Sequence, residues 1–114
     1  MTRTSLPVVE TATCCSDLRD LMPADRAESV AARFKALADP TRVQLLALVA
    51  GAGAGEACVC DLTDAIGLSQ PTISHHLSIL VKAGLLTRER RGTWAWFAIA
   101  ADGLAAMRDD LMLG

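Results

Sequence analysis

Apolar residues recur at helical spacing along most of the chain, and capping residues divide this pattern into separate helices. The first helix is predicted to begin at Pro23, and its apolar stripe starts at Val30. Asp39 and Pro40 predict the start of a second helix, because Asp caps a helix well and Pro fits its first position. This second helix is apolar nearly all round up to the glycine-rich stretch 51–55, so we expect it to be central. The apolar positions of the two helices are Val30, Phe34, Leu37, Val43, Leu45, Leu46, Leu48 and Val49.

The next two predicted helices are short, and a glycine turn separates them. The first runs from about residue 59 to residue 66 and ends at Gly67. The second has Ser69 as its N-cap and Pro71 in its first turn, and Gly84 ends it. Its buried stripe consists of Ile73, Leu77, Leu80 and Val81. Two short helices joined in this way are typical of a helix-turn-helix.

Two strands and a last helix complete the predicted fold. Residues 85–89 and 94–99 are predicted strands, and the sequence Arg-Arg-Gly-Thr at 90–93 joins them into a β-hairpin with a basic tip. Asp102 is the expected cap of the last helix, whose apolar positions are Leu104, Met107, Leu111 and Met112. The expected fold class is therefore mainly α with a small β-hairpin (α+β).

Length and composition predict how many domains the chain forms and where in the cell it is located. The chain has 114 residues, of which 52% are hydrophobic. This is enough for one domain that is only marginally stable alone, so we expect a dimer. We expect residues 1–20 to form a mobile arm that carries Cys14 and Cys15, and residues 21–114 to form the domain. The chain has neither a long apolar run nor a signal-peptide pattern, so no membrane partner is expected and a cytoplasmic location is predicted.

The net charge of −2 gives no argument for a nucleic-acid partner, but the charge is unevenly distributed. Residues 69–93 carry four basic side chains against one Glu. When Leu77 faces inward, short polar side chains of the same helix face outward, where they can bond to base edges in a major groove. The hairpin arginines would reach phosphates or the neighbouring minor groove. The candidate contacts to double-stranded DNA are Ser69, Gln70, Thr72, Ser74, His75, His76, Lys82, Arg88, Arg90 and Arg91.

Two other features have structural interpretations that we favour. The adjacent residues His75 and His76 point about 100° apart on a helix, so they are poorly placed to share one metal ion. Trp94 and Trp96 alternate along a strand, and we expect them to pack against the core rather than to stack on bases.

Three stretches of the sequence resemble the ArsR/SmtB family of metal-responsive repressors. They are FKALADPTRVQLL at 34–46, CVCDLTDAIGLSQPTISHHLSILVKAGLL at 58–86 and RERRGTWAWFAI at 88–99. The DPxR box, the CVCDL segment and the SQPTxSxHL helix are specific in combination. The resemblance implies a winged helix-turn-helix that dimerises through its first and last helices and binds a two-fold-symmetric operator.

Four cysteines provide candidate metal ligands: Cys14, Cys15, Cys58 and Cys60. In a cytosolic protein such residues are thiols or ligands more often than disulfides. Thiolates are the ligands that soft ions prefer; As(III) takes three sulfurs, and Cd(II) often takes four. Cys58 and Cys60 begin the short helix, where unpaired N–H groups and the helix dipole favour a thiolate.

The resemblance also bears on the ligand set. Relatives with a CVCDL segment are similar to sensors whose ligands begin at Cys58 and Cys60. In the arsenic-sensing branch a third cysteine often follows, but here Thr63 holds that position. In some members N-terminal cysteines complete the site, which implies a role for Cys14 and Cys15. Zinc sensors of the family carry His on the last helix, and this helix has none. We expect As(III) as the inducer, with Cd(II) or Pb(II) as the alternative.

Three rival functions remain open at this stage. The cysteines could form a redox switch on the same DNA-binding fold, through oxidation or a disulfide. A thiol enzyme is disfavoured because no C-x-x-C motif lies at a strand-to-helix junction. A pure dimerisation module is disfavoured because it does not explain the basic hairpin.

Overall fold

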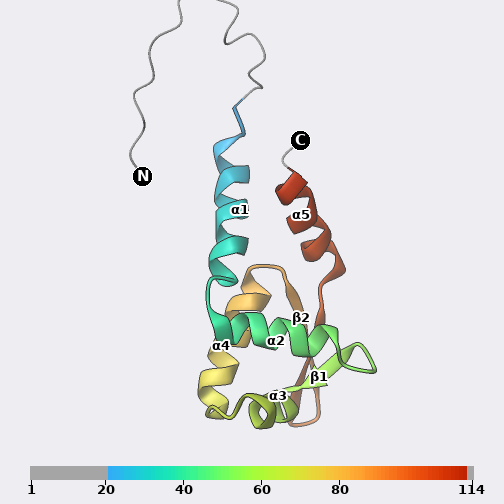
Figure 1. Cartoon of the computed structure of the whole chain (residues 1–114). Coiled ribbons are helices and arrows are strands. Elements are labelled where there is room, and N and C mark those ends of the chain that lie inside the picture. Colours follow the sequence, from blue (N-terminus) through green and yellow to red (C-terminus); the bar gives the residue numbers. More distant parts are fainter. Residues whose placement is uncertain (1–20, 113–114) are drawn as a thin grey trace, which may run out of the picture.

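Helices dominate the part of the chain that the computed structural model describes, which is residues 21–112 (Figure 1). The elements in chain order are α1 (Ala24–Ala36), α2 (Pro40–Ala50), β1 (Glu56–Cys58), α3 (Val59–Ile66), α4 (Gln70–Lys82), β2 (Leu86–Arg91), β3 (Trp94–Ile99) and α5 (Ala101–Met112). The predicted class, mainly helical with a small β element, is confirmed. None of the helices in these residues is both long and apolar enough to cross a membrane.

Local capping fixes three of the helix ends where the sequence predicted them. The Asp39 carboxylate accepts the backbone N–H groups of Thr41 at 2.8 Å and Arg42 at 3.3 Å, at the start of α2. Gly67 ends α3 with a φ of +85°, a left-handed conformation that glycine adopts without a steric cost. Ser69 caps α4 by accepting the N–H of Thr72 at 3.4 Å.

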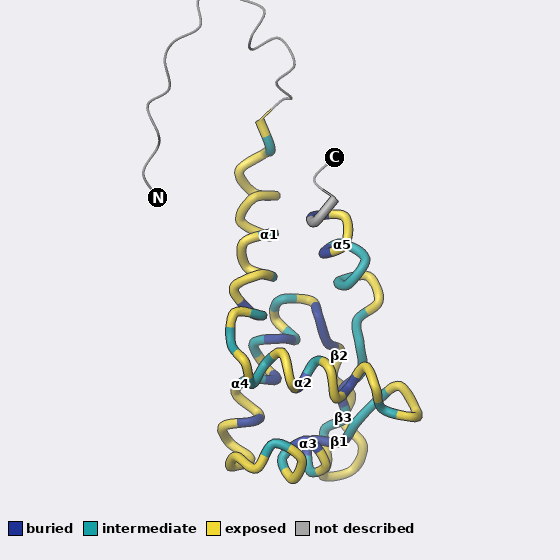
Figure 2. Tube along the Cα trace, in the orientation of Figure 1, coloured by how far each residue is buried: buried dark blue, intermediate teal, exposed yellow. Residues whose placement is uncertain are grey.

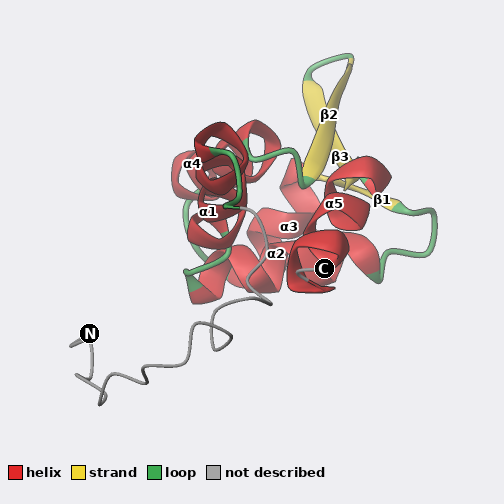
Figure 3. Ribbon diagram, turned by 90° about the horizontal axis from the view of Figure 1, so that it is seen from above, coloured by secondary structure: helices red, strands yellow, loops and turns green. Residues whose placement is uncertain are grey.

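The β element differs from the predicted two-stranded hairpin in two respects. It is a three-stranded antiparallel sheet of order β1-β3-β2, in which Cys58 of β1 pairs with Trp96 of β3. In addition, β2 continues through Arg91, so the turn is the pair Gly92-Thr93 and both arginines belong to the strand. Gly92 has a φ of +61°, which permits this tight connection. The hairpin of β2 and β3, hereafter the wing, projects from the helices (Figure 3).

The core lies where α2, α3 and α4 meet the sheet, as Figure 2 shows. Its largest fully buried side chains are Leu45, Val49, Ile73, Leu77, Leu80, Leu85 and Leu86. Helix α2 packs against α3, α4 and the sheet, as expected for a central helix, but Val43 is 49% and Leu48 is 37% exposed. Helix α2 therefore has one core face, and some of its other apolar side chains lie in solvent.

Helices α1 and α5 lie side by side at one end of the molecule (Figure 1). Arg33 of α1 donates to the Asp110 carboxylate of α5 from Nε at 3.1 Å and from Nη2 at 2.5 Å, and Asp110 is only 3% exposed. Phe34 of the same helix is 40% exposed. Helix α5 begins at Ala101, so Asp102 lies in its first turn rather than at the predicted N-cap. The side chains of Leu111 and Met112 lie outside the described set.

Candidate functional site

Helix α4 has an apolar face in the core and a polar face in solvent. Ile73, Leu77 and Leu80 are fully buried. The candidate DNA contacts on this helix and at its cap that are exposed to solvent are Ser69, Gln70, Thr72, Ser74, His75 and Lys82. This division gives the helix a fixed seat and leaves short donors and acceptors on the side away from the protein, which is what reading base edges requires.

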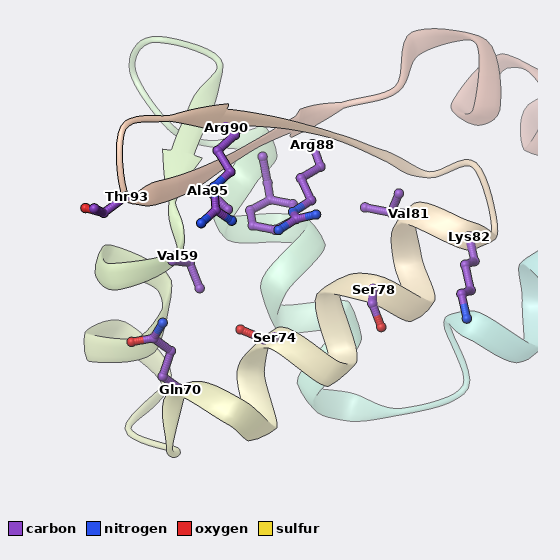
Figure 4. Close-up of a pocket in the computed structure, with 11 residues that line it drawn as sticks. Val59, Gln70, Ser74, Ser78, Val81, Lys82, Arg88, Arg90, Thr93 and Ala95 are labelled. Atoms are coloured by element: carbon purple, nitrogen blue, oxygen red, sulfur yellow. The ribbon is translucent and has the colours of Figure 1, made fainter.

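A cleft of about 550 Å³ separates α4 from the wing. Arg88 and Arg90 extend from β2 toward α4, and Lys82 lies at the end of that helix (Figure 4). None of these three cations forms an ion pair with another residue in the described part of the chain. The cleft floor is apolar and includes Val59 and Phe97. A basic rim of this kind suits a polyanion such as a nucleic-acid backbone.

His76 is half-buried and differs in environment from its exposed neighbour His75. Arg42 of α2 lies with Nη1 3.1 Å from Nδ1 of His76. Because an arginine can only donate, Nδ1 accepts and the ring proton is on Nε2. Arg42 also donates from Nε to the carbonyl oxygen of Ala36. The arginine of the DPxR box thus joins the end of α1, the start of α2 and helix α4, a role that the sequence analysis missed.

Arg91 is held by two carboxylates within the protein. Its guanidinium donates to Glu56 of β1 at 2.5 and 2.8 Å, and to Glu89 of its own strand at 2.6 and 3.2 Å. The same group lies over the ring of Trp96, 4.9 Å from its centroid. The hydrogen bond from Arg91 lowers the pKa of Glu56 below its ordinary value, so this carboxylate stays charged. Arg91 therefore differs from Arg88 and Arg90 in having protein partners.

The two tryptophans of the wing have different environments. Trp96 packs against the core cluster, as expected. Trp94, next to the turn, is 44% exposed, so the expectation that both rings pack inward is wrong for this residue.

Cys58 and Cys60 meet at the junction of β1 and α3. Cys58 is the N-cap of α3, where its Sγ accepts the backbone N–H of Cys60 at 3.4 Å. The two sulfurs lie 2.6 Å apart, and Cys58 is buried while Cys60 is half-buried. The hydrogen bond with Cys58, together with burial, raises the pKa of the Cys60 thiol. At Cys60, the neighbouring thiol and burial therefore oppose the thiolate character expected at this helix start.

This thiol pair fits part of the ligand set of a soft ion. Within the described residues, no group of three or more Cys, His, Asp or Glu side chains is placed to hold a metal ion. Thr63, one helical turn after Cys60, uses its hydroxyl to donate to the Val59 carbonyl at 2.7 Å. Further sulfurs would have to come from Cys14 and Cys15, which lie outside the described residues.

Comparison with known proteins assigns the family. Residues 39–88 match the bacterial regulatory proteins of the arsR family. An uncharacterised helix-turn-helix transcriptional regulator of Methanocaldococcus jannaschii is 45% identical over 78 residues, which are 68% of this chain and 85% of that protein. The chain belongs to the ArsR family. It is thus a helix-turn-helix transcriptional regulator and not an enzyme, as the sequence predicted.

Two further proteins place this ArsR-family regulator among its relatives. An arsenic resistance transcriptional regulator of Pseudomonas putida is 48% identical over 66 residues, which cover 58% of this chain but only 50% of that protein. The homodimeric winged helix-turn-helix DNA-binding domain of a possible ArsR-family regulator from Mycobacterium bovis is 29% identical, with a TM-score of 0.64. That comparison covers 84% of this chain and 89% of the solved chain, which confirms the winged helix-turn-helix fold.

Proposed function

We propose that this ArsR-family regulator is a repressor that binds operator DNA as a ligand-free homodimer and leaves the DNA when cysteine thiolates bind As(III). The observation that carries this proposal is the position of the Cys58–Cys60 pair at the N-terminus of α3. Helix α3 leads directly into the cap of α4, so a ligand held there acts on the helix that precedes the DNA reader. The Pseudomonas putida relative, whose name gives it a role in arsenic resistance, supports the choice of ligand.

Helix α4 enters the major groove in this proposal. Its exposed residues read base edges, and Gln70 and Thr72 in the first turn come closest to them. Lys82, Arg88 and Arg90 border the cleft and contact phosphates. His76, oriented by Arg42, offers its Nε2–H group as a donor.

The homodimer forms through α1 and α5. The Arg33–Asp110 pair holds these two helices against each other, and α1 leaves Phe34 exposed next to that pair. A second copy that covers this face buries its apolar side chains and spaces two copies of α4 along the DNA. The homodimeric state of the Mycobacterium bovis domain supports this arrangement.

Three sulfurs form the As(III) site: those of Cys58 and Cys60 and that of either Cys14 or Cys15. This set is proposed from the chemistry of the donors, because As(III) takes three thiolates and the described residues supply two. Four thiolates together would suit Cd(II) or Pb(II), which are the alternative inducers.

The test uses the reduced full-length chain and two paired variants. Cys58→Ser/Cys60→Ser is expected to bind promoter DNA as the wild type does and to remain bound when arsenite is added. Cys14→Ser/Cys15→Ser is expected to lose the response as well. Adding Thr63→Cys to that second variant places a sulfur near Cys60 and is expected to restore release. The proposal is wrong if arsenite still releases Cys58→Ser/Cys60→Ser from DNA.

A further inference from the structure

The contacts of Arg91 lead directly to the thiol site. Glu56, its main partner, lies two residues before Cys58 on the same three-residue strand. Trp96, which lies beneath its guanidinium, is the residue that pairs with Cys58 across the sheet. Two short paths therefore connect Cys58 to Arg91, one along β1 through Glu56 and one across to β3 through Trp96.

The same contacts occupy Arg91 within the protein. Its guanidinium forms a two-point contact with Glu56 and a second contact with Glu89. These bonds use four of the five N–H groups of the guanidinium, so a phosphate would find one N–H group free and two carboxylates beside it. Arg88 and Arg90 of the same strand have no such partner among the described residues. The sheet thus contains cations with two different environments.

We propose that Arg91 is a positioning residue that couples the thiol site to the wing, and that it is not a phosphate contact. The part of this proposal that concerns ligand response rests on the proposed function above. Ligand capture at Cys58 changes the position of β1, Glu56 moves with that strand, and Arg91 transmits the change to β2. The wing then no longer holds Arg88 and Arg90 where the DNA backbone needs them.

The first test asks whether Arg91 touches DNA and needs no ligand. The dissociation constant of the ligand-free protein for promoter DNA is measured at a series of salt concentrations. Replacing a cation that binds a phosphate lowers the slope of log K against log salt by about 0.9 for each phosphate that is no longer neutralised. Arg90→Ala is expected to show this reduction, and Arg91→Ala is expected to keep the wild-type slope. An equal reduction in both variants overturns the proposal.

The second test measures the coupling itself. The ratio of DNA dissociation constants with and without saturating arsenite is determined for the wild type, Glu56→Gln and Arg91→Ala. Each substitution is expected to reduce this ratio by about 2–5-fold, while arsenite affinity in the absence of DNA is unchanged. Arg91→Lys separates charge from geometry, because lysine keeps the cation but lacks the planar two-point fork. We expect Arg91→Lys to behave like Arg91→Ala in this ratio.

The outcomes distinguish this proposal from the proposed function. A wild-type protein that arsenite leaves on DNA refutes the proposed function and the coupling together, and the salt slopes still decide whether Arg91 binds a phosphate. A wild-type response that Arg91→Ala and Glu56→Gln leave unaltered refutes the coupling alone. A full response in Arg91→Lys also overturns it, because a simple cation would then be sufficient.

Discussion

Replacing Gly103 by alanine tests how closely α5 is seated on the connection between α4 and β2. A Cβ at residue 103 would stand 1.6 Å from the carbonyl oxygen of Gly84 and 2.7 Å from its carbonyl carbon, where real Cβ contacts are essentially never under 3.0 Å. The obstacle is backbone rather than a flexible side chain. The adjacent Leu85 is fully buried, and its carbonyl accepts the N–H of Ala100 at 3.0 Å. Neither side can therefore move without disturbing the core.

Two effects of opposite sign determine how much Gly103→Ala changes the free energy of unfolding. Helix propensity alone favours alanine over glycine by up to about 1 kcal/mol. Overpacking of a filled site costs about 1–3 kcal/mol, and a backbone obstacle places this substitution at the upper end. We therefore expect Gly103→Ala to lower the free energy of unfolding by about 2 kcal/mol.

The assay is thermal unfolding followed by circular dichroism at one fixed protein concentration, because the proposed dimer would make Tm depend on concentration. A loss of about 2 kcal/mol corresponds to a fall in Tm of about 8–16 °C for a domain of this size. Gly53→Ala is the matched control, since a Cβ there meets no atom within 4 Å. Its Tm is expected to stay the same or rise slightly. The reasoning is refuted if Gly103→Ala is as stable as the wild type, because propensity would then outweigh the steric clash.

Two other substitutions test the contacts that hold the helices. Arg33→Ala leaves the buried Asp110 carboxylate without its donor and is expected to reduce the free energy of unfolding, measured in urea, by about 1.5–3 kcal/mol. The double variant Arg33→Met/Asp110→Leu is expected to recover most of this loss. Equal stability of Arg33→Ala and the wild type would show that the pair is dispensable. Burial alone would raise the pKa of Asp39, but the N–H groups of Arg42 and Thr41 lower it. The stability from this cap is therefore fully present above the ordinary aspartate pKa and is lost as pH falls through the lowered pKa of Asp39. Asp39→Asn keeps the cap without the titration, so its Tm is expected to fall less than that of the wild type between neutral pH and pH about 3, and parallel pH profiles would contradict this assignment.

Features that depend on neighbouring residues were predicted from the sequence. The restart at Asp39-Pro40, the end of α3 at Gly67 and the cap at Ser69 each involve contacts within four residues, and all three are present. The buried stripe of α4 follows from its helical spacing, because only one face of that helix is apolar.

Features that depend on distant partners were not predicted. Strand β1 is three residues long and exists because it pairs with β3, about forty positions further along the chain. The two partners of Arg91 are equally instructive, since Glu89 is close in sequence but Glu56 is 35 residues away. An arginine in a basic run is expected to face DNA, and only the sheet order shows that a carboxylate reaches it.

The apolar surface of α2 shows a different limit. A helix that is apolar nearly all round is expected in the centre of a domain, yet Val43 and Leu48 are exposed. The hydrophobic pattern of α2 shows which positions are apolar, but it does not show which of them the rest of the chain buries. The cysteines combine both cases. Cys58 and Cys60 lie at the start of α3, where local signals in the sequence placed them, whereas Cys14 and Cys15 lie outside the described region.

The central claim is that a thiophilic ligand removes this regulator from DNA. The most direct measurement is fluorescence anisotropy of labelled promoter DNA with the reduced full-length protein, titrated with arsenite, then with Cd(II), then with Zn(II). The account predicts tight binding without ligand and release by arsenite at concentrations at which Zn(II) has no effect. Release by Cd(II) alone would change the inducer and keep the mechanism. Binding that none of the three disturbs would contradict the account.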